Sequence, residues 1–322
     1  MNNIMVGSCA QKRLGWLVLA LAIAMIGGGC DKQEASTDTP RSGKPVVVTT
    51  FYPTKYFCQR IGGDHLEVVC PVPDDEDAIY WMPDTEAIQV YQQADVIVLN
   101  GAGFAKWVQK VSLPEGRVID TAKPLKDDLI TFQHATVHSH GKSGQHAHEG
   151  VDGHTWVDPV NAKIQANEIY QALVKRYPEH ETAFEQGFTA MAKDLDALDA
   201  KLKEYQAAYK DQPLLASHPA YNYLARRYGW NIKNLDLDPE KMPSDEVIQS
   251  IRELLKKHPA KFLLWEASPT KEITDRLQRD LGLTSIEFSP CELLSEQDRQ
   301  KGLDYIQIMR NNLDHVRSAL SD

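Results

Sequence analysis

Histidines are concentrated in one stretch of this chain. Of its 11 histidines, six lie within residues 134–154 (HATVHSHGKSGQHAHEGVDGH), among glycine, serine and small polar residues. Neutral imidazole is a common ligand for zinc, copper and nickel, and several imidazoles on a mobile loop can hold metal weakly in many geometries. A solvated polar loop without a role is the alternative. We predict an auxiliary metal-binding loop with the candidate ligands His134, His138, His140, His146 and His148.

Two further histidines stand beside segments that should be ordered. His154 lies in GHTWVDP, where Asp158 is a natural N-cap and Pro159 a natural first-turn residue of a helix. His218 follows the apolar run LLAS, and α/β sheets place their ligands at the carboxyl ends of parallel strands. A structural histidine is the alternative for His218. We predict that His154 and His218 form the centre of a metal site.

Short apolar runs that alternate with helical patterns must position these histidines. Strands are expected at residues 44–50, 66–72, 96–100, 117–120, 213–217, 232–237, 261–265 and 284–288. Helices are expected between most of them and, after the last, at 302–320. This alternation is typical of βαβ units, so we predict an α/β fold with four parallel strands in each half.

Long helical patterns occupy the region between the two halves. Residues 160–176 and 181–209 are separated by a polar break at Tyr177 and Pro178. The second segment carries apolar residues at spacings of three and four, which indicates an amphipathic helix with one buried face. We predict that this helix forms a stiff connection between two lobes.

The N-terminus has the pattern of an export signal. Lys12 and Arg13 precede an apolar run at 14–26, which is too short for a comfortable membrane span, and three glycines then precede Cys30. Small residues directly before a cysteine resemble a bacterial lipobox, which predicts lipidation of Cys30. Signal cleavage with an incidental Cys30 is the alternative. We predict a signal peptide at 1–29 and a flexible polar tether at 30–43.

Composition and cysteine content narrow the class of protein. With 322 residues, 42% of them hydrophobic and 25% charged, the bulk of the chain should form a soluble globule. The net charge of −10 argues against a nucleic-acid partner, since phosphate binding requires basic patches. Disulfides persist outside the cytoplasm, so Cys58 and Cys70 are a candidate pair, with two free thiols as the alternative.

Several segments resemble the solute-binding proteins of zinc and manganese ABC importers. They include VVVTTFYPTKYFCQRIGGDHLEV, QQADVIVLNGAGFAKWV, HTWVDPVNAKIQANEIYQAL, ASHPAYNYLARRYG and NLDLDPEKMPSDE, and the match spans nearly all of residues 45–320. The resemblance implies two (β/α)₄ lobes joined by a long backbone helix, with a metal site between the lobes. The His-rich loop resembles the zinc-associated branch more than the manganese branch. By motif, the second and third ligands of the family correspond to His154 and His218.

Two ligand positions of that family differ in this chain. Ile79 stands where the family has its first histidine, in a segment like PHxYEP, and Ser289 stands where it has an aspartate before a proline. Zinc in a stable site takes four ligands, or three and a water, so other donors must contribute. The candidates are Glu266 at the end of FLLWE, Asp77, Cys291, Glu292 or a loop histidine. Each of these could instead be a solvated charge or a structural residue.

The function predicted from the sequence is that of an exported, lipid-anchored and monomeric receptor. It would capture a divalent transition metal, with Zn²⁺ preferred and Mn²⁺ as an alternative, and deliver it to an ABC-importer permease. A retuned site for another metal, a metal complex or metal storage is the second interpretation. An exported metallohydrolase is the third, although no HExxH motif or nucleophile elbow is present. The predicted domains are an N-terminal lobe at 44–178 with the His-rich loop at 134–153, a linking helix at 179–210, and a C-terminal lobe at 211–322.

Overall fold

Four short strands in the first half of the chain form one parallel sheet. The computed structural model describes residues 43–322 except 75, 133–135, 140–144, 149, 210 and 322. The strands are β1 (Val46–Thr49), β2 (Glu67–Val69), β3 (Val96–Leu99) and β4 (Val118–Asp120), in the order β2-β1-β3-β4. Helices α1 (Tyr52–Gly62) and α2 (Thr85–Gln93) follow β1 and β2. This sheet and its helices are called the first lobe.

The second half repeats the same arrangement. Its strands are β7 (Pro213–Ala216), β8 (Asn231–Asn234), β9 (Phe262–Trp265) and β10 (Thr284–Glu287), in the order β10-β9-β7-β8. The helices are α5 (Asn222–Tyr228), α6 (Asp245–Leu255), α7 (Lys271–Leu281), α8 (Glu296–Lys301) and α9 (Tyr305–Ser321). This sheet and its helices are called the second lobe. Both sheets are parallel throughout, so the predicted α/β fold with four strands in each half is confirmed.

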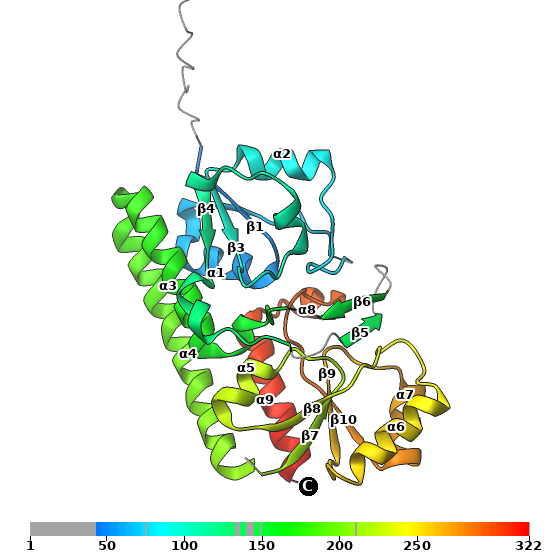
Figure 1. The fold of residues 1–322 in the computed structure, drawn as a ribbon. Coiled ribbons are helices and arrows are strands. Elements are labelled where there is room, and N and C mark those ends of the chain that lie inside the picture. The colour runs from blue at the N-terminus through cyan, green and yellow to red at the C-terminus, as the bar shows by residue number, and fades with distance from the viewer. Residues whose placement is uncertain are drawn as a thin grey trace, which may run out of the picture. The chain divides into compact units, whose positions relative to one another are not determined.

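Helices α3 (Pro159–Arg176) and α4 (Glu181–Tyr209) connect the two lobes. Asp158 caps α3, because its side chain accepts a hydrogen bond from the Val160 N–H at 2.9 Å. A short 3₁₀ turn at Pro178–His180 separates the helices at the predicted break. Helix α4 contacts α1 of the first lobe and both α5 and α9 of the second, and it runs alongside both lobes in Figure 1.

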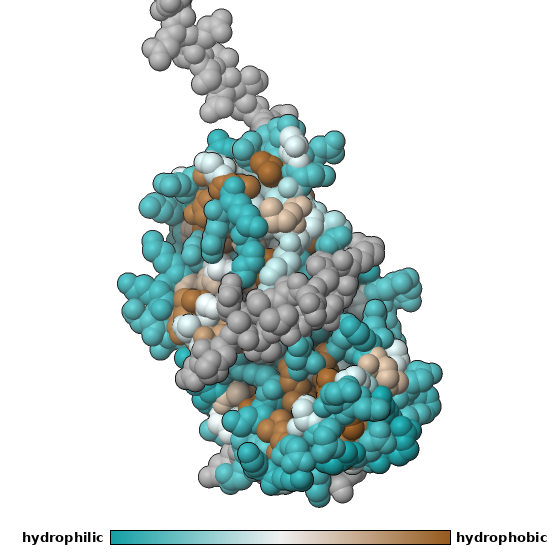
Figure 2. Space-filling model, turned by 45° about the vertical axis from the view of Figure 1, so that its right-hand side comes forward, coloured by the Kyte–Doolittle hydropathy of each residue, from teal (hydrophilic) through white to brown (hydrophobic). Residues whose placement is uncertain are grey.

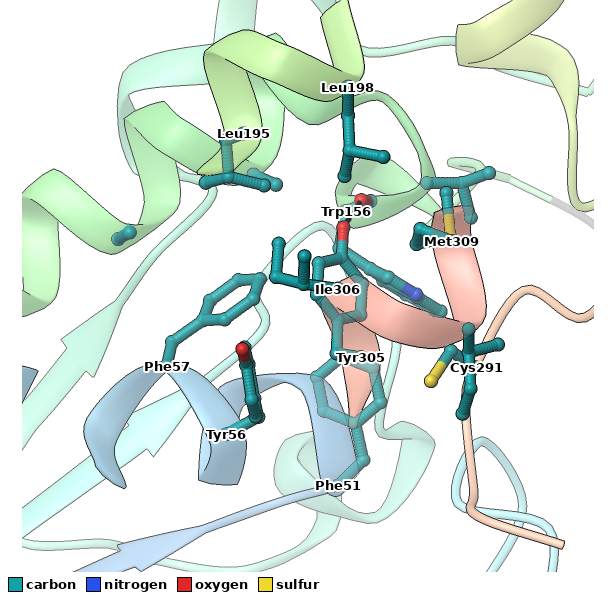
Figure 3. Packing of buried hydrophobic residues seen from close by; sticks show 14 of the residues in the cluster. Phe51, Tyr56, Phe57, Trp156, Leu195, Leu198, Cys291, Tyr305, Ile306 and Met309 are labelled. Carbon is teal, nitrogen blue, oxygen red and sulfur yellow. Dashed lines mark hydrogen bonds between the residues drawn. The ribbon is translucent and has the colours of Figure 1, made fainter. Parts of the chain in front are cut away.

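One hydrophobic cluster continues through both lobes and the connecting helices. Figure 3 shows Phe51 and Phe57 of the first lobe, Leu195 and Leu198 of α4, and Tyr305 and Met309 of α9 around Trp156, all belonging to this cluster. Trp156 Nε1 donates to the Pro290 carbonyl at 2.7 Å, and the Tyr305 hydroxyl donates to the Trp156 carbonyl at 2.7 Å. Apolar burial with satisfied polar atoms makes the contact between the lobes a packed core.

A short antiparallel hairpin interrupts the segment that the sequence predicted as a loop. It consists of β5 (Thr136–Ser139) and β6 (Gln145–His148), and its register pairs His138 with His146. At its base, the Phe132 N–H donates to the Gly150 carbonyl at 2.8 Å. The prediction of irregular structure was wrong for these eight residues, because the composition pointed to a loop while β-branched Thr136 and Val137 favour extended backbone.

The described surface is mainly polar. Hydrophilic residues predominate on the face in Figure 2, and the exposed large hydrophobic residues of the described part are Met82, Val90 and Met242. None of the described helices combines the length and the apolarity that a membrane span requires. The predicted signal peptide and nearly all of the predicted tether, including Cys30, lie outside the described residues.

An ionic contact on α4 ties both lobes to this helix. The Asp194 carboxylate accepts hydrogen bonds from Arg60 of α1 and from Arg310 of α9, each at 2.9 Å. Burial raises the pKa of this carboxyl, but the hydrogen bonds and charges of Arg60 and Arg310 outweigh burial and hold the pKa below its usual value.

We expect Asp194→Asn to lower the free energy of unfolding by about 1 kcal/mol at pH 7, measured by urea denaturation. A carboxylate with a depressed folded-state pKa stabilises the fold above its unfolded pKa of about 3.9. The difference from the wild type should therefore shrink as the pH falls below about 4. Asp196→Asn is the matched control, because its exposed pair with Lys163 of α3 should matter less. Equal losses in both variants would contradict the bridging role of Asp194.

Candidate metal centre

Two histidines and one carboxylate come together between the lobes. One ligand atom from each of His154, His218 and Glu292 lies within 4.8 Å of the others. The two imidazole rings are 5.4 Å apart between centroids and nearly perpendicular, at 80°. Both rings are buried, and Glu292 is half-buried. The structure thus brings together the two histidines of the sequence prediction with one of its four further candidates.

His154 is held in place by a carboxylate that the sequence analysis missed. Its Nδ1 lies 2.7 Å from Oδ1 of the buried Asp152, and its Nε2 lies 2.9 Å from Glu292 Oε1. Asp152 is fixed in turn by α5, where the Asn222 amide donates to Asp152 Oδ2 at 2.8 Å and the Tyr223 hydroxyl donates to its carbonyl at 2.7 Å. A carboxylate behind a metal-binding histidine sets its tautomer and raises its basicity. The sequence Asp-Gly-His, in which Asp152 stands two residues before His154, is the signal that could have indicated Asp152.

The charges around His154 determine its protonation. Burial lowers the pKa of the ring, but Asp152, followed by Glu292, outweighs burial and raises the pKa to about 10. Asp152 and Glu292 therefore stabilise the protonated form of the ring. Because a histidine must be deprotonated to bind a metal, metal binding at His154 would compete with protons.

His218 lies where β7 ends, at the centre of the second sheet. The adjacent Ser217 N–H donates to the Leu264 carbonyl of β9 at 2.8 Å, which ties the start of this loop to the sheet. His218 Nδ1 lies 3.5 Å from Oε2 of Glu266, the residue after β9. Neighbouring β7 and β9 thus present the histidine and a carboxylate at their carboxyl ends, as expected for ligand sites in α/β sheets. The structure places Glu266 beside His218 and outside the three-residue cluster, and its role as a ligand stays a prediction.

A tight turn after β10 brings Glu292 to the site. The Ser289 N–H donates to Asn312 Oδ1 at 3.0 Å, and the Cys291 N–H donates to the Ser289 hydroxyl at 3.1 Å. Cys291 adopts a left-handed backbone with φ of 63°. Ser289 therefore supports the turn, and the carboxylate nearest to His154 on this segment is the predicted candidate Glu292, three residues later.

The structure does not support Cys291 as a ligand. Its side chain is fully buried in the hydrophobic cluster near Tyr305, as Figure 3 shows, and outside the three-residue cluster. Burial, reinforced by neighbouring carboxylates, raises the pKa of the thiol well above its usual value, so the thiolate that a metal requires is disfavoured.

Asp77 also lies outside the cluster. Its Oδ1 accepts a hydrogen bond from the Ile79 N–H at 2.8 Å and so shapes the turn before that residue.

The suggested disulfide is not formed, since Cys58 and Cys70 are both free thiols. Cys58 is fully buried in the hydrophobic cluster, and Cys70 is half-buried and packs against the same cluster.

The candidate histidines of the loop stay predictions. His134 and His140 lie outside the described residues. His138, His146 and His148 are placed by their backbone in the β5–β6 hairpin. The hairpin leads through Gly150 and Val151 directly to Asp152 and His154.

The fold and the site together define a class of protein. Two parallel-sheet lobes, joined by a long helix, with imidazole and carboxylate donors gathered between them, are characteristic of two-lobed metal-binding receptors. The chain belongs to the family described as zinc-uptake complex component A, periplasmic, whose model matches residues 47–319.

Curated relatives agree with this family. The chain is 28% identical over 308 residues to the zinc-binding lipoprotein AdcA of Streptococcus pneumoniae serotype 4, covering 94% of this chain and 60% of AdcA. It thus spans less than two thirds of that relative. It is 27% identical over 317 residues to the high-affinity zinc uptake system protein ZnuA of Bacillus subtilis, covering 96% of this chain and 98% of ZnuA.

Solved structures show the same architecture. The metal-dependent lipoprotein YcdH of Bacillus subtilis matches with a TM-score of 0.75 at 26% identity, over 85% of this chain and 98% of that one. The Zn(II)-bound ZnuA-like domain of AdcA from Streptococcus pneumoniae matches with a TM-score of 0.73 at 25% identity, over 86% and 98% of the two chains.

Proposed function

We propose that this protein is an extracytoplasmic zinc receptor that captures Zn²⁺ between its lobes and delivers it to the permease of an ABC importer. The observation that carries the proposal is the convergence of His154, His218 and Glu292, which come from three separate segments of the chain. Carboxylates behind both histidines give the arrangement of a metal site with oriented ligands. The names of the relatives, which describe zinc binding and zinc uptake, support the same cargo.

The donor set favours zinc over manganese. Two imidazoles with one carboxylate suit Zn²⁺, whereas Mn²⁺ prefers carboxylate, carbonyl and water oxygens in an octahedral arrangement. Because Asp152 and Glu266 hold the two buried rings in place, the site has little freedom to adopt the higher coordination number of Mn²⁺. A site retuned to another metal, a metal complex or metal storage is the competing interpretation.

A metal titration tests the proposal. The metal-stripped mature protein would be titrated with Zn²⁺, Mn²⁺, Ni²⁺ and Cu⁺ while the tryptophan fluorescence is followed. Trp156 is a suitable reporter, because its ring centroid lies 5.4 Å from that of His154. We expect one Zn²⁺ per chain to bind in the nanomolar range and Mn²⁺ to bind far more weakly. If no divalent metal binds more tightly than about micromolar, the receptor function is excluded.

Attachment and partners belong to the same proposal. The basic, apolar and small-residue pattern before Cys30 supports export and lipid anchoring, and the relatives include named lipoproteins. The absence of enzymatic activity, the monomeric state and the lack of a nucleic-acid partner stay predictions. Radiolabelled palmitate incorporation in a bacterial host, lost in Cys30→Ala, would test the anchor.

A further inference from the structure

A network of buried polar side chains lies where the first lobe meets α3. Its four members are each at most 1% exposed: Asn100 directly after β3, Thr121 directly after β4, Thr155 in the turn before α3, and Gln165 within α3. Burial of an amide or a hydroxyl is costly unless the group is hydrogen-bonded. None of the four belongs to the three-residue cluster, so the metal donors do not account for them.

Gln165 is the centre of this network and uses both ends of its amide. Its Nε2 donates to Asn100 Oδ1 at 2.9 Å and to the Thr121 hydroxyl at 2.8 Å. Its Oε1 accepts a hydrogen bond from the Thr155 hydroxyl at 3.0 Å. The Thr121 hydroxyl donates in turn to the Asn100 carbonyl at 2.9 Å. One side chain of α3 thus links the ends of two strands to the turn that carries His154.

The network holds the chain on both sides of His154. On one side, Asn100 Nδ2 donates to the Gly153 carbonyl at 2.9 Å, in a hydrogen bond that is itself buried. On the other side, Thr155 is held by its hydrogen bond to Gln165. The two residues that flank this metal-site histidine are therefore tied to the first lobe through side chains that do not contact its ring.

Close packing restrains the same segment. A Cβ at Gly153 would lie 3.0 Å from two side-chain atoms of Phe104 and 3.2 Å from its Cα, so the absence of a side chain allows this approach. The His154 ring, by contrast, is oriented by Asp152, which Asn222 of the second lobe holds. The first lobe thus fixes the backbone of His154, and the second lobe fixes the carboxylate that orients its ring.

We propose that Gln165 and Asn100 are positioning residues, which fix the backbone of His154 and thereby set how tightly the protein holds its metal. This inference rests on the proposed metal-receptor function and deepens it. A ligand has to be kept within about 0.5 Å of its productive position by the residues around it. Loosening the turn at His154 therefore weakens the site, although no donor atom is removed.

Two matched threonine variants separate positioning from general stability. Thr155→Val and Thr121→Val each replace a fully buried hydroxyl that contacts Gln165 by a methyl group, but only Thr155 adjoins His154. We expect Thr155→Val to weaken Zn²⁺ binding about tenfold, the lower end of the range for residues that support a ligand, and Thr121→Val to change it less than about twofold. Competition with a chromophoric chelator measures both affinities. Equal affinities in the two variants would overturn the inference.

Two further measurements show whether the segment and the metal geometry have changed. In the metal-free protein, hydrogen–deuterium exchange of the peptide 152–158 should be faster in Thr155→Val and Gln165→Met than in the wild type, and unchanged in Thr121→Val. The visible spectrum of the Co²⁺-loaded protein should change in Thr155→Val and match the wild type in Thr121→Val. Exchange and spectrum that are both unaltered in Thr155→Val would contradict positioning.

The outcomes distinguish this inference from the proposed function. If the wild type binds no divalent metal more tightly than about micromolar, the receptor function fails, and the metal-free exchange still tests whether the network holds the turn. If the wild type binds Zn²⁺ tightly and Thr155→Val binds it equally well, the receptor function stands and the positioning role fails. Should Gln165→Met not fold, as judged by circular dichroism, the two threonine variants decide the question.

Discussion

Replacing His218 by alanine is expected to weaken Zn²⁺ binding by about 100- to 1,000-fold. Structural zinc sites bind with roughly 10–16 kcal/mol, so one ligand in four accounts for about 2.5–4 kcal/mol, and 1.4 kcal/mol is a factor of ten. His218 is buried, and its Nδ1 lies 3.5 Å from Glu266 Oε2, so alanine would remove both a candidate ligand and this ionic contact. Competition with a chromophoric chelator measures the affinity.

His315→Ala is the matched control for this variant. His315 is exposed on α9, where its Nδ1 lies 3.1 Å from the Glu287 carbonyl oxygen, and it lies outside the three-residue cluster. It should leave the affinity unchanged. Unchanged affinity in His218→Ala, with a native circular dichroism spectrum, would remove His218 from the site and with it the three-residue cluster.

The second large effect distinguishes Glu266 from Glu292, two carboxylates that the sequence offered as candidate ligands. Glu292→Gln should weaken zinc binding by about 100-fold or more, because it removes a charged ligand from the cluster. Glu266→Gln should cost about 10- to 100-fold, the range for residues that orient a ligand. The amide keeps the size of the side chain in both variants, so packing changes little.

Glu287→Gln is the control for both, since this exposed carboxylate at the end of β10 pairs with Ser268. Zinc affinity should be unaffected by it. If Glu266→Gln proved more damaging than Glu292→Gln, the assignment of ligand and orienting residue would have to be exchanged. X-ray absorption of the zinc complexes of Glu266→Gln and Glu292→Gln should show two imidazoles bound to the metal in each.

The path of the chain explains why the site couples the lobes. Asp152 and His154 precede α3, but Asn222 and Tyr223 of the second lobe hold Asp152. Glu292 follows a turn that Asn312 of α9 fixes. Loss of these contacts would move donors that belong to one site, so metal affinity depends on packing well beyond the ligands.

Much of the fold follows from local sequence. The central strands β1, β3, β7 and β9 are short apolar runs because parallel strands inside a sheet are buried on both faces, and such runs can be recognised in the sequence alone. The start of α3 follows from Asp158 and Pro159, whose capping chemistry acts within one turn. The β5–β6 hairpin was missed because its pairing depends on register between residues whose composition is that of a loop.

For the site, the sequence by itself determined His154 and His218, because each stands next to a recognisable helix start or strand end. It also determined that Ile79 cannot be a ligand, since its side chain has no donor atom. Only the tertiary structure shows where the remaining candidates lie relative to the two histidines. The turn at Ser289–Cys291 buries the thiol and brings Glu292 to His154, whereas Glu266 lies behind His218 and Asp77 supports the turn before Ile79. The physical reason is that a carboxylate's role depends on which atom it reaches across the fold, and distances between segments 138 residues apart cannot be read from local patterns.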